Sequence, residues 1–151
     1  MKHEILIYNK TRRQVPGKLI KPVILKALQF LKIKQPVELA VLFVDKEEIK
    51  RLNKIWRKVN KAPDELSFGL NSRQTAGLAK GLYSMLSLGL ARRDALGEII
   101  INVKEASNKD YLSKILIHSL LHLLGHHHEK SRKEAKKMER LEAKIFKHSN
   151  I

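Results

Sequence analysis

The chain has 151 residues, of which 43% are hydrophobic and 30% are charged, a balance typical of one globular domain over residues 1–151. It contains no cysteine, which excludes a disulfide scaffold, a thiolate metal site and a cysteine nucleophile. Its 31 Lys and Arg residues against 15 Asp and Glu give a net charge of +16. Because no acidic excess matches the lysines, this charge favours a polyanionic partner, nucleic acid first, over a merely solubilising surface.

The N-terminal sequence MKHEILIYNKTRRQ has neither the apolar core nor the small-residue cleavage pattern of a signal peptide. The longest apolar run is about ten residues and is interrupted by histidine, too short to cross a bilayer. We therefore expect a cytoplasmic protein without a membrane segment.

The first half of the chain predicts alternating strands and helices. Residues 4–8 (EILIY) and 37–44 (VELAVLFV) are typical of strands, and residues 18–31 carry apolar side chains at helical spacing. Asp45 should cap a helix that runs to Trp56, since acidic residues follow it in the first turn.

The second half predicts two more strands and two helices. DELSFGL (64–70) indicates a strand, and GEIIINV (97–103) a strand buried on both faces. A helix from about residue 108 or 110 should end at Gly125, and residues 131–147 form an amphipathic helix. Residues 69–96 give no clear pattern. The sequence thus predicts an α+β domain with a small mixed β-sheet packed against helices.

The segment HSLLHLLGHHH (118–128) predicts a zincin-like metal-binding helix. His118 and His122 are one turn apart on the same side of a helix, and Gly125 can turn the chain back towards the metal with His128. This H-x-x-x-H-x-x-G-x-x-H spacing is that of metzincins, and three imidazoles with an open fourth position are typical of catalytic zinc. We expect one Zn²⁺ per chain, held by His118, His122 and His128.

Two features of this segment leave alternatives open. The run His126–His128 could be a solvated turn, and His127 is the alternative third ligand if the turn differs from expectation. Zincin peptidases have glutamate directly after the first histidine as the general base, and here that position is Ser119. A serine without a basic partner is a poor base, so proteolysis is disfavoured and the positive charge directs attention to a phosphodiester substrate.

Four blocks occur in order along the chain: LNKIWRKVNKAPDELSF at 52–68, LGEIII at 96–101, HSLLHLLGHHH at 118–128 and MERLE at 138–142. They resemble LNxxYRxxxxPTDVLSF, LGDIVI, HGxLHLxGYDH and MxxLE of the YbeY endoribonucleases, bacterial ribosomal-RNA maturation factors. Departures from these patterns include Ala62 and Pro63 for Pro-Thr, Glu98 for aspartate and Ser119 for glycine.

The resemblance implies a zinc-dependent, single-strand-specific endoribonuclease acting in ribosomal RNA maturation and ribosome quality control. Its partners would be ribosomal RNA and the ribosomal subunit or associated proteins. The family arginine falls on Arg57, which can pair bidentately with a phosphate, and we expect Arg57 and His118 to be catalytic.

Substrate contacts are predicted around Arg57. Lys58 and Lys61 belong to a basic tract that could follow an RNA backbone, and Ser67 and Phe68 should wall the cleft. The tract consists of Arg51, Lys54, Arg57, Lys58 and Lys61. Trp56 could stack on a base, although a tryptophan at this position is more often part of the core.

Two rival functions remain at this point. The zincin spacing favours a metallopeptidase, which Ser119 opposes. A non-catalytic, zinc-stabilised RNA-binding assembly factor is also conceivable, although a structural zinc site normally fills all four positions with protein ligands.

Overall fold

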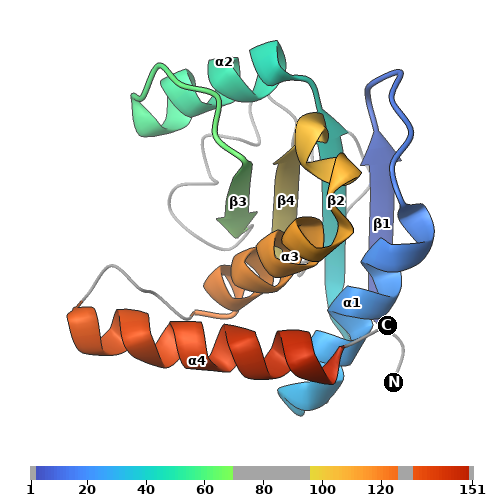
Figure 1. The fold of residues 1–151 in the computed structure, drawn as a ribbon, viewed down its shortest axis with the longest axis vertical. Coiled ribbons are helices and arrows are strands. Elements are labelled where there is room, and N and C mark those ends of the chain that lie inside the picture. Colours follow the sequence, from blue (N-terminus) through green and yellow to red (C-terminus); the bar gives the residue numbers. More distant parts are fainter. Residues whose placement is uncertain (1–2, 70–95, 126–130, 150–151) are drawn as a thin grey trace.

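The computed structural model describes residues 3–69, 96–125 and 131–149, and within them four strands form one mixed sheet in the order β1-β2-β4-β3 (Figure 1). The first three strands in this order are parallel, and β3 joins the edge antiparallel to β4. The strands are β1 (Glu4–Asn9), β2 (Glu38–Val44), β3 (Glu65–Gly69) and β4 (Gly97–Asn102). The predicted small mixed sheet is confirmed.

Four α-helices accompany the sheet in the described part of the chain. They are α1 (Gly17–Phe30), α2 (Lys46–Arg57), α3 (Lys109–Leu123) and α4 (Arg132–His148), with a short 3₁₀ helix, η2 (Val103–Ser107), before α3. Each predicted strand and helix is present with its ends shifted by only one or two residues. Among these helices, none combines the length and apolar character that crossing a membrane requires.

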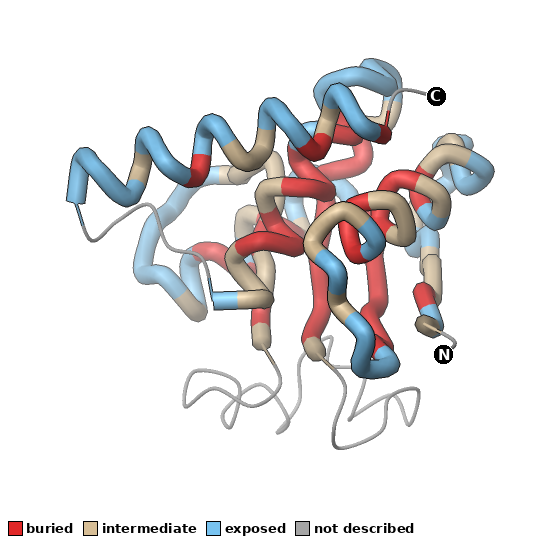
Figure 2. Tube along the Cα trace, turned by 90° about the horizontal axis from the view of Figure 1, so that it is seen from below, coloured by how far each residue is buried: buried red, intermediate tan, exposed pale blue. Residues whose placement is uncertain are grey.

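The two faces of the sheet are covered by different helices. On one face, α1 and α3 pack across the strands and α4 lies against both, so that buried side chains of all three helices share one core (Figure 1). On the other face, α2 inserts Ile49 and Leu52 against Leu42, Leu66 and Ile100. All residues of β2 and β4 are buried (Figure 2). Burial on both faces was predicted for β4 from its continuous isoleucines.

The helix ends follow from local chemistry. Asp45 accepts a hydrogen bond from the backbone N–H of Glu48 at 2.9 Å, which caps α2 as predicted. Asn108 caps α3 in the same way through the N–H of Tyr111, at 3.0 Å. Gly125, just beyond α3, has φ of 97°, the left-handed conformation expected of a glycine that ends a helix.

Gly97 lets α3 approach the edge of the sheet closely. A Cβ at this position would lie 2.3 Å from the carbonyl oxygen of Phe68 and 2.9 Å from Cδ2 of Leu123. The absence of a side chain therefore allows β3, β4 and the end of α3 to meet. This packing places the histidines of α3 beside β3.

Candidate functional site

His118 and His122 face each other from successive turns of α3. Their Nε2 atoms are 3.1 Å apart, and their ring planes are inclined at 70°. Two ligands of one tetrahedral zinc, each bonded at about 2.0–2.1 Å, stand about 3.3 Å apart. The two imidazoles are therefore close enough to share a zinc ion, and a zinc ion between them remains a prediction.

Glu142 of α4 fixes the orientation and the tautomer of the His118 ring. One of its carboxylate oxygens accepts a hydrogen bond from Nδ1 of His118. A proton on Nδ1 leaves the lone pair on Nε2, the atom that faces His122. This hydrogen bond raises the pKa of His118, burial opposes the rise, and the charges of Glu142 and Glu65 add to it. A carboxylate behind a metal-binding histidine commonly fixes the ring in this way.

Ser119, the residue in the position of the peptidase base, is fully buried and points to β3. Its hydroxyl donates a hydrogen bond of 2.8 Å to Oε2 of Glu65. The serine thus holds a carboxylate that comes from the sheet. Ser119 and Glu65, the two partners of this hydrogen bond, differ from the glycine and valine of the family patterns.

Arg57 and His118, the two predicted catalytic residues, line the same pocket of about 430 Å³. Arg57 is the last residue of α2, and His118 lies in the middle of α3, on the other side of the sheet's edge. The pocket combines cationic and anionic side chains with one aliphatic wall. Its lining consists of Arg57, Pro63, Asp64, Glu65, Tyr111, Lys114, Ile115, His118 and Glu142.

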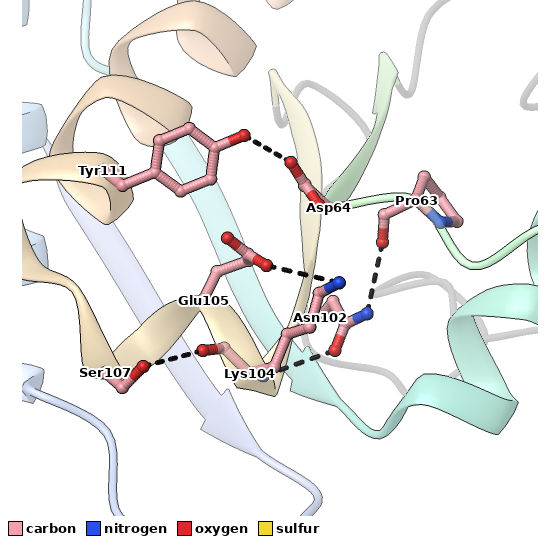
Figure 3. Close-up of polar contacts among 7 residues, drawn as sticks. All are labelled: Pro63, Asp64, Asn102, Lys104, Glu105, Ser107 and Tyr111. Carbon is pink, nitrogen blue, oxygen red and sulfur yellow. Dashed lines mark hydrogen bonds and ion pairs between the residues drawn. The ribbon is translucent and has the colours of Figure 1, made fainter.

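The loop between α2 and β3 is tied by polar contacts to the end of β4 and to the start of α3 (Figure 3). The hydroxyl of Tyr111 donates to Oδ2 of Asp64, and Nδ2 of Asn102 donates to the carbonyl of Pro63 at 3.4 Å. The backbone N–H of Asn102 donates to the carbonyl of Asp64 at 2.9 Å. The hydrogen bond to Asp64 is the largest of the effects that raise the pKa of Tyr111 to about 12. These contacts hold residues 63 and 64 against the pocket.

Among the predicted substrate contacts, Lys58 and Lys61 are exposed in the loop after α2 and do not line this pocket. Lys58 ends α2 with φ of 62°, and the carbonyl of Lys61 accepts a hydrogen bond from the side chain of Asn53 at 3.0 Å. Their predicted role in following an RNA backbone remains a prediction.

Ser67 and Phe68 point to opposite faces of β3, because side chains alternate along a strand. Ser67 is on the same face as Glu65, towards α3. Phe68 is buried in the core under α2, where its ring meets that of Trp56 edge-on at 6.2 Å between centroids. The two residues therefore cannot wall one cleft together, and Trp56 belongs to the edge of the core.

Several pocket residues were not assigned a role from the sequence: Asp64, Glu65, Tyr111, Lys114 and Glu142. Asp64 and Glu142 lie within blocks that matched the family patterns, which was a usable signal. Tyr111 and Lys114 share a face of α3 with His118, one to two turns earlier, so helical spacing could also have indicated them.

The third predicted zinc ligand, His128, lies outside the described residues, as do His126 and His127. Among the residues that the structure does describe, no cluster of three His, Asp or Glu side chains is arranged to hold a metal. The described part of the chain thus supplies a pair of imidazoles, and a third ligand remains a prediction.

The fold and the pocket together define a small α+β protein with a candidate metal centre at the edge of a mixed sheet. The family profile described as Endoribonuclease YbeY matches residues 6–150. The chain belongs to the endoribonuclease YbeY family.

Individual relatives agree with this assignment. Endoribonuclease YbeY of Persephonella marina is 34% identical over 135 residues, which cover 89% of this chain and 84% of that protein. Endoribonuclease YbeY of a Sulfurihydrogenibium species is 33% identical over 148 residues, 96% of this chain and 91% of that protein. A solution structure of a Thermotoga maritima protein matches with a TM-score of 0.55 and 25% identity, covering 96% of this chain and 88% of that one.

Proposed function

We propose that this protein is a zinc-dependent endoribonuclease that cleaves single-stranded regions of ribosomal RNA in the cytoplasm, in rRNA maturation and ribosome quality control. One observation carries the proposal: the Nε2 atoms of His118 and His122 face each other, and His118 lines a pocket together with Arg57. The names of the curated relatives support the reaction class. The ribosomal subunit or its associated proteins would be the partners.

The donor set fits zinc. Two imidazoles 3.1 Å apart, one of them oriented by a carboxylate, are ligands that zinc commonly takes, and His128 is the proposed third. When bound, such an ion supplies an activated water or polarises a phosphoryl oxygen. Glu142 favours the tautomer of His118 that carries its lone pair on Nε2, the atom that would bind the metal.

Arg57 supplies the phosphate contact. Its guanidinium is exposed at the end of α2, faces the pocket and has no carboxylate partner among the described residues. A planar guanidinium can donate two parallel hydrogen bonds to a phosphate and stabilise the charge that grows on it during attack. The net charge of +16 favours a polyanion over a peptide as the ligand of Arg57.

The size of the pocket supports an unpaired strand. A volume of about 430 Å³ is in the range of small-ligand pockets and suits a single nucleotide unit. An unpaired strand can place one of its nucleotides in such a pocket, whereas a base-paired strand keeps its bases stacked inside a helix. We therefore expect loops and single-stranded ends to be cleaved in preference to duplexes.

The test compares three substrates under one set of metal conditions. Purified protein is incubated with an unstructured RNA, with the same RNA annealed to its complement, and with casein. Each incubation is run as prepared, after chelation and after zinc is restored, with His122→Ala as the control variant. We expect cleavage of the unpaired RNA alone, lost on chelation and regained with zinc. Cleavage of casein instead would establish the metallopeptidase, and metal-dependent RNA binding without cleavage would establish the assembly factor.

A further inference from the structure

Lys114 is the second cation of the pocket, and it comes from the histidine helix. It lies one turn before His118 on the same face of α3, and both residues line the pocket with Arg57. Its ammonium is 5.0 Å from the centre of the Phe146 ring of α4. This cation–π contact limits the positions that the flexible lysine side chain can take.

The carboxylates of the pocket are hydrogen-bonded to other side chains, so that its two cations can bind an anion. All three carboxylates accept a hydrogen bond from a side chain that is not a lysine or arginine: Asp64 from Tyr111, Glu65 from Ser119 and Glu142 from His118. In the part of the chain that the structure describes, neither Arg57 nor Lys114 forms an ion pair. Two cations therefore line a pocket whose carboxylates are hydrogen-bonded to tyrosine, serine and histidine side chains.

We propose that Lys114 and Arg57 form a clamp for one phosphodiester group of a single RNA strand, beside His118. This inference rests on the proposed function and extends it to a residue of α3. Arg57 approaches from α2 with a planar, bidentate donor, and Lys114 approaches from α3 as a compact point charge. A phosphate held between them would be fixed from both walls of the pocket. The cations would also offset the repulsion that the three carboxylates exert on an incoming phosphate.

The alternative is that Lys114 only packs its aliphatic stem against Phe146 and that its charge is solvated. Binding measurements at several salt concentrations separate the two roles, because each phosphate contact adds about 0.7 to the slope of log affinity against log salt for a single strand. The probe is a short unstructured 2′-O-methyl oligoribonucleotide with a fluorescent end, followed by anisotropy with the zinc-loaded protein.

The comparison uses Lys114→Gln and a matched control, Lys109→Gln, which removes a charge from an exposed position of the same helix outside the pocket. We expect Lys114→Gln to weaken binding by roughly tenfold at low salt and to lower the slope by about 0.7, and Lys109→Gln to stay within about twofold of the parent. Lys114→Arg should retain most of the affinity, which guards against misfolding. Equal effects of Lys114→Gln and Lys109→Gln would overturn the clamp.

A double-substitution cycle tests whether both cations hold the same phosphate. If they do, Lys114→Gln should cost much less in an Arg57→Gln background than in the parent, because the phosphate is already misplaced. Strictly additive losses would assign the two cations to separate phosphates and overturn the clamp. A parent protein that binds no oligoribonucleotide and cleaves no RNA would instead contradict the proposed function, so the two failures are distinguishable.

Discussion

The carboxylate of Glu142 accepts a hydrogen bond from Nδ1 of His118, so the last helix of the chain orients an imidazole of α3. One turn earlier in α3 and one turn later in α4, Lys114 lies over the ring of Phe146. The residue that comes earlier in α3 contacts the residue that comes later in α4, so the two helices pack antiparallel. A single helix–helix packing therefore positions both the candidate metal ligand and the candidate phosphate ligand.

Removing the Glu142 carboxylate should weaken zinc binding. Loss of a carboxylate that orients a metal-binding histidine typically lowers metal affinity about 10- to 100-fold, and we expect this range for Glu142→Ala, with a smaller loss for Glu142→Gln. Glu139→Gln, on the exposed side of the same helix, should leave the affinity unchanged. Competition with a chromophoric zinc chelator measures all three variants. Parental affinity in Glu142→Ala would show that the hydrogen bond has no part in metal binding.

Zinc content tests the three-histidine set directly. The protein should carry close to one zinc per chain, because three imidazoles and one open position complete a tetrahedral site. His122→Ala and His128→Ala should each lose the metal, whereas His126→Ala should retain most of it. Elemental analysis after dialysis against metal-free buffer gives the content. If His127→Ala rather than His128→Ala loses zinc, the turn after Gly125 presents the neighbouring histidine instead.

Much of the fold follows from short-range patterns in the sequence. The continuous apolar run of β4 predicts a strand buried on both faces, and this strand is buried at every position. The segment of β2 was predicted only as a strand, and it is also buried throughout. Asp45 and Gly125 mark helix ends because a carboxylate can accept from free N–H groups and a glycine can adopt positive φ. The order of strands in the sheet was not predicted, since it depends on contacts between segments far apart in the chain.

In the candidate site too, local relationships could be predicted and contacts between distant segments could not. His118 and His122 could be paired from the sequence because helical geometry alone relates positions four apart. Glu65 could not be placed, since its contact with Ser119 depends on how β3 packs against α3. Ser67 and Phe68 were predicted to share a wall, and the alternation of side chains along β3 shows why they do not.

Replacing Gly97 should destabilise the fold. A Cβ there would lie 2.3 Å from a backbone carbonyl, so β3 and β4 would have to separate or α3 would have to move. We expect Gly97→Ala to lower the free energy of unfolding by about 3 kcal/mol, at the upper end of the usual cost of overpacking. Gly17→Ala is the matched control, because its Cβ would meet nothing within 4 Å. Urea unfolding measures both, and equal stabilities would contradict the close approach.

Tyr111 should titrate with the pKa of about 12 that its hydrogen bond to Asp64 produces. The neutral phenol donates this bond and the phenolate would be repelled, so the contact stabilises the fold below the ordinary pKa of 10.0 and is lost as pH rises through about 12. Asp64→Asn should return the pKa towards 10.0. Phenolate absorbance during alkaline titration reports the change, and Tyr111→Phe identifies which transition belongs to this residue. An unshifted transition in Asp64→Asn would contradict the assigned cause.

Substitutions at Arg57 test the proposed reaction apart from the fold. Lysine keeps the charge but loses the planar pair of donors, so Arg57→Lys should bind zinc and RNA nearly as the parent does while cleaving more slowly. Loss of one preorganised charge-stabilising donor costs about 10²–10³ in rate, and Arg57→Ala should lose more and also bind RNA less tightly. Lys46→Ala removes a cation from an exposed position at the other end of the same helix, outside the pocket, and should cleave at the parental rate. The measurement is single-turnover cleavage of an unstructured RNA, with zinc content checked for each variant. Parental cleavage by zinc-loaded Arg57→Ala would place Arg57 outside the catalytic machinery, even though it lines the pocket with His118.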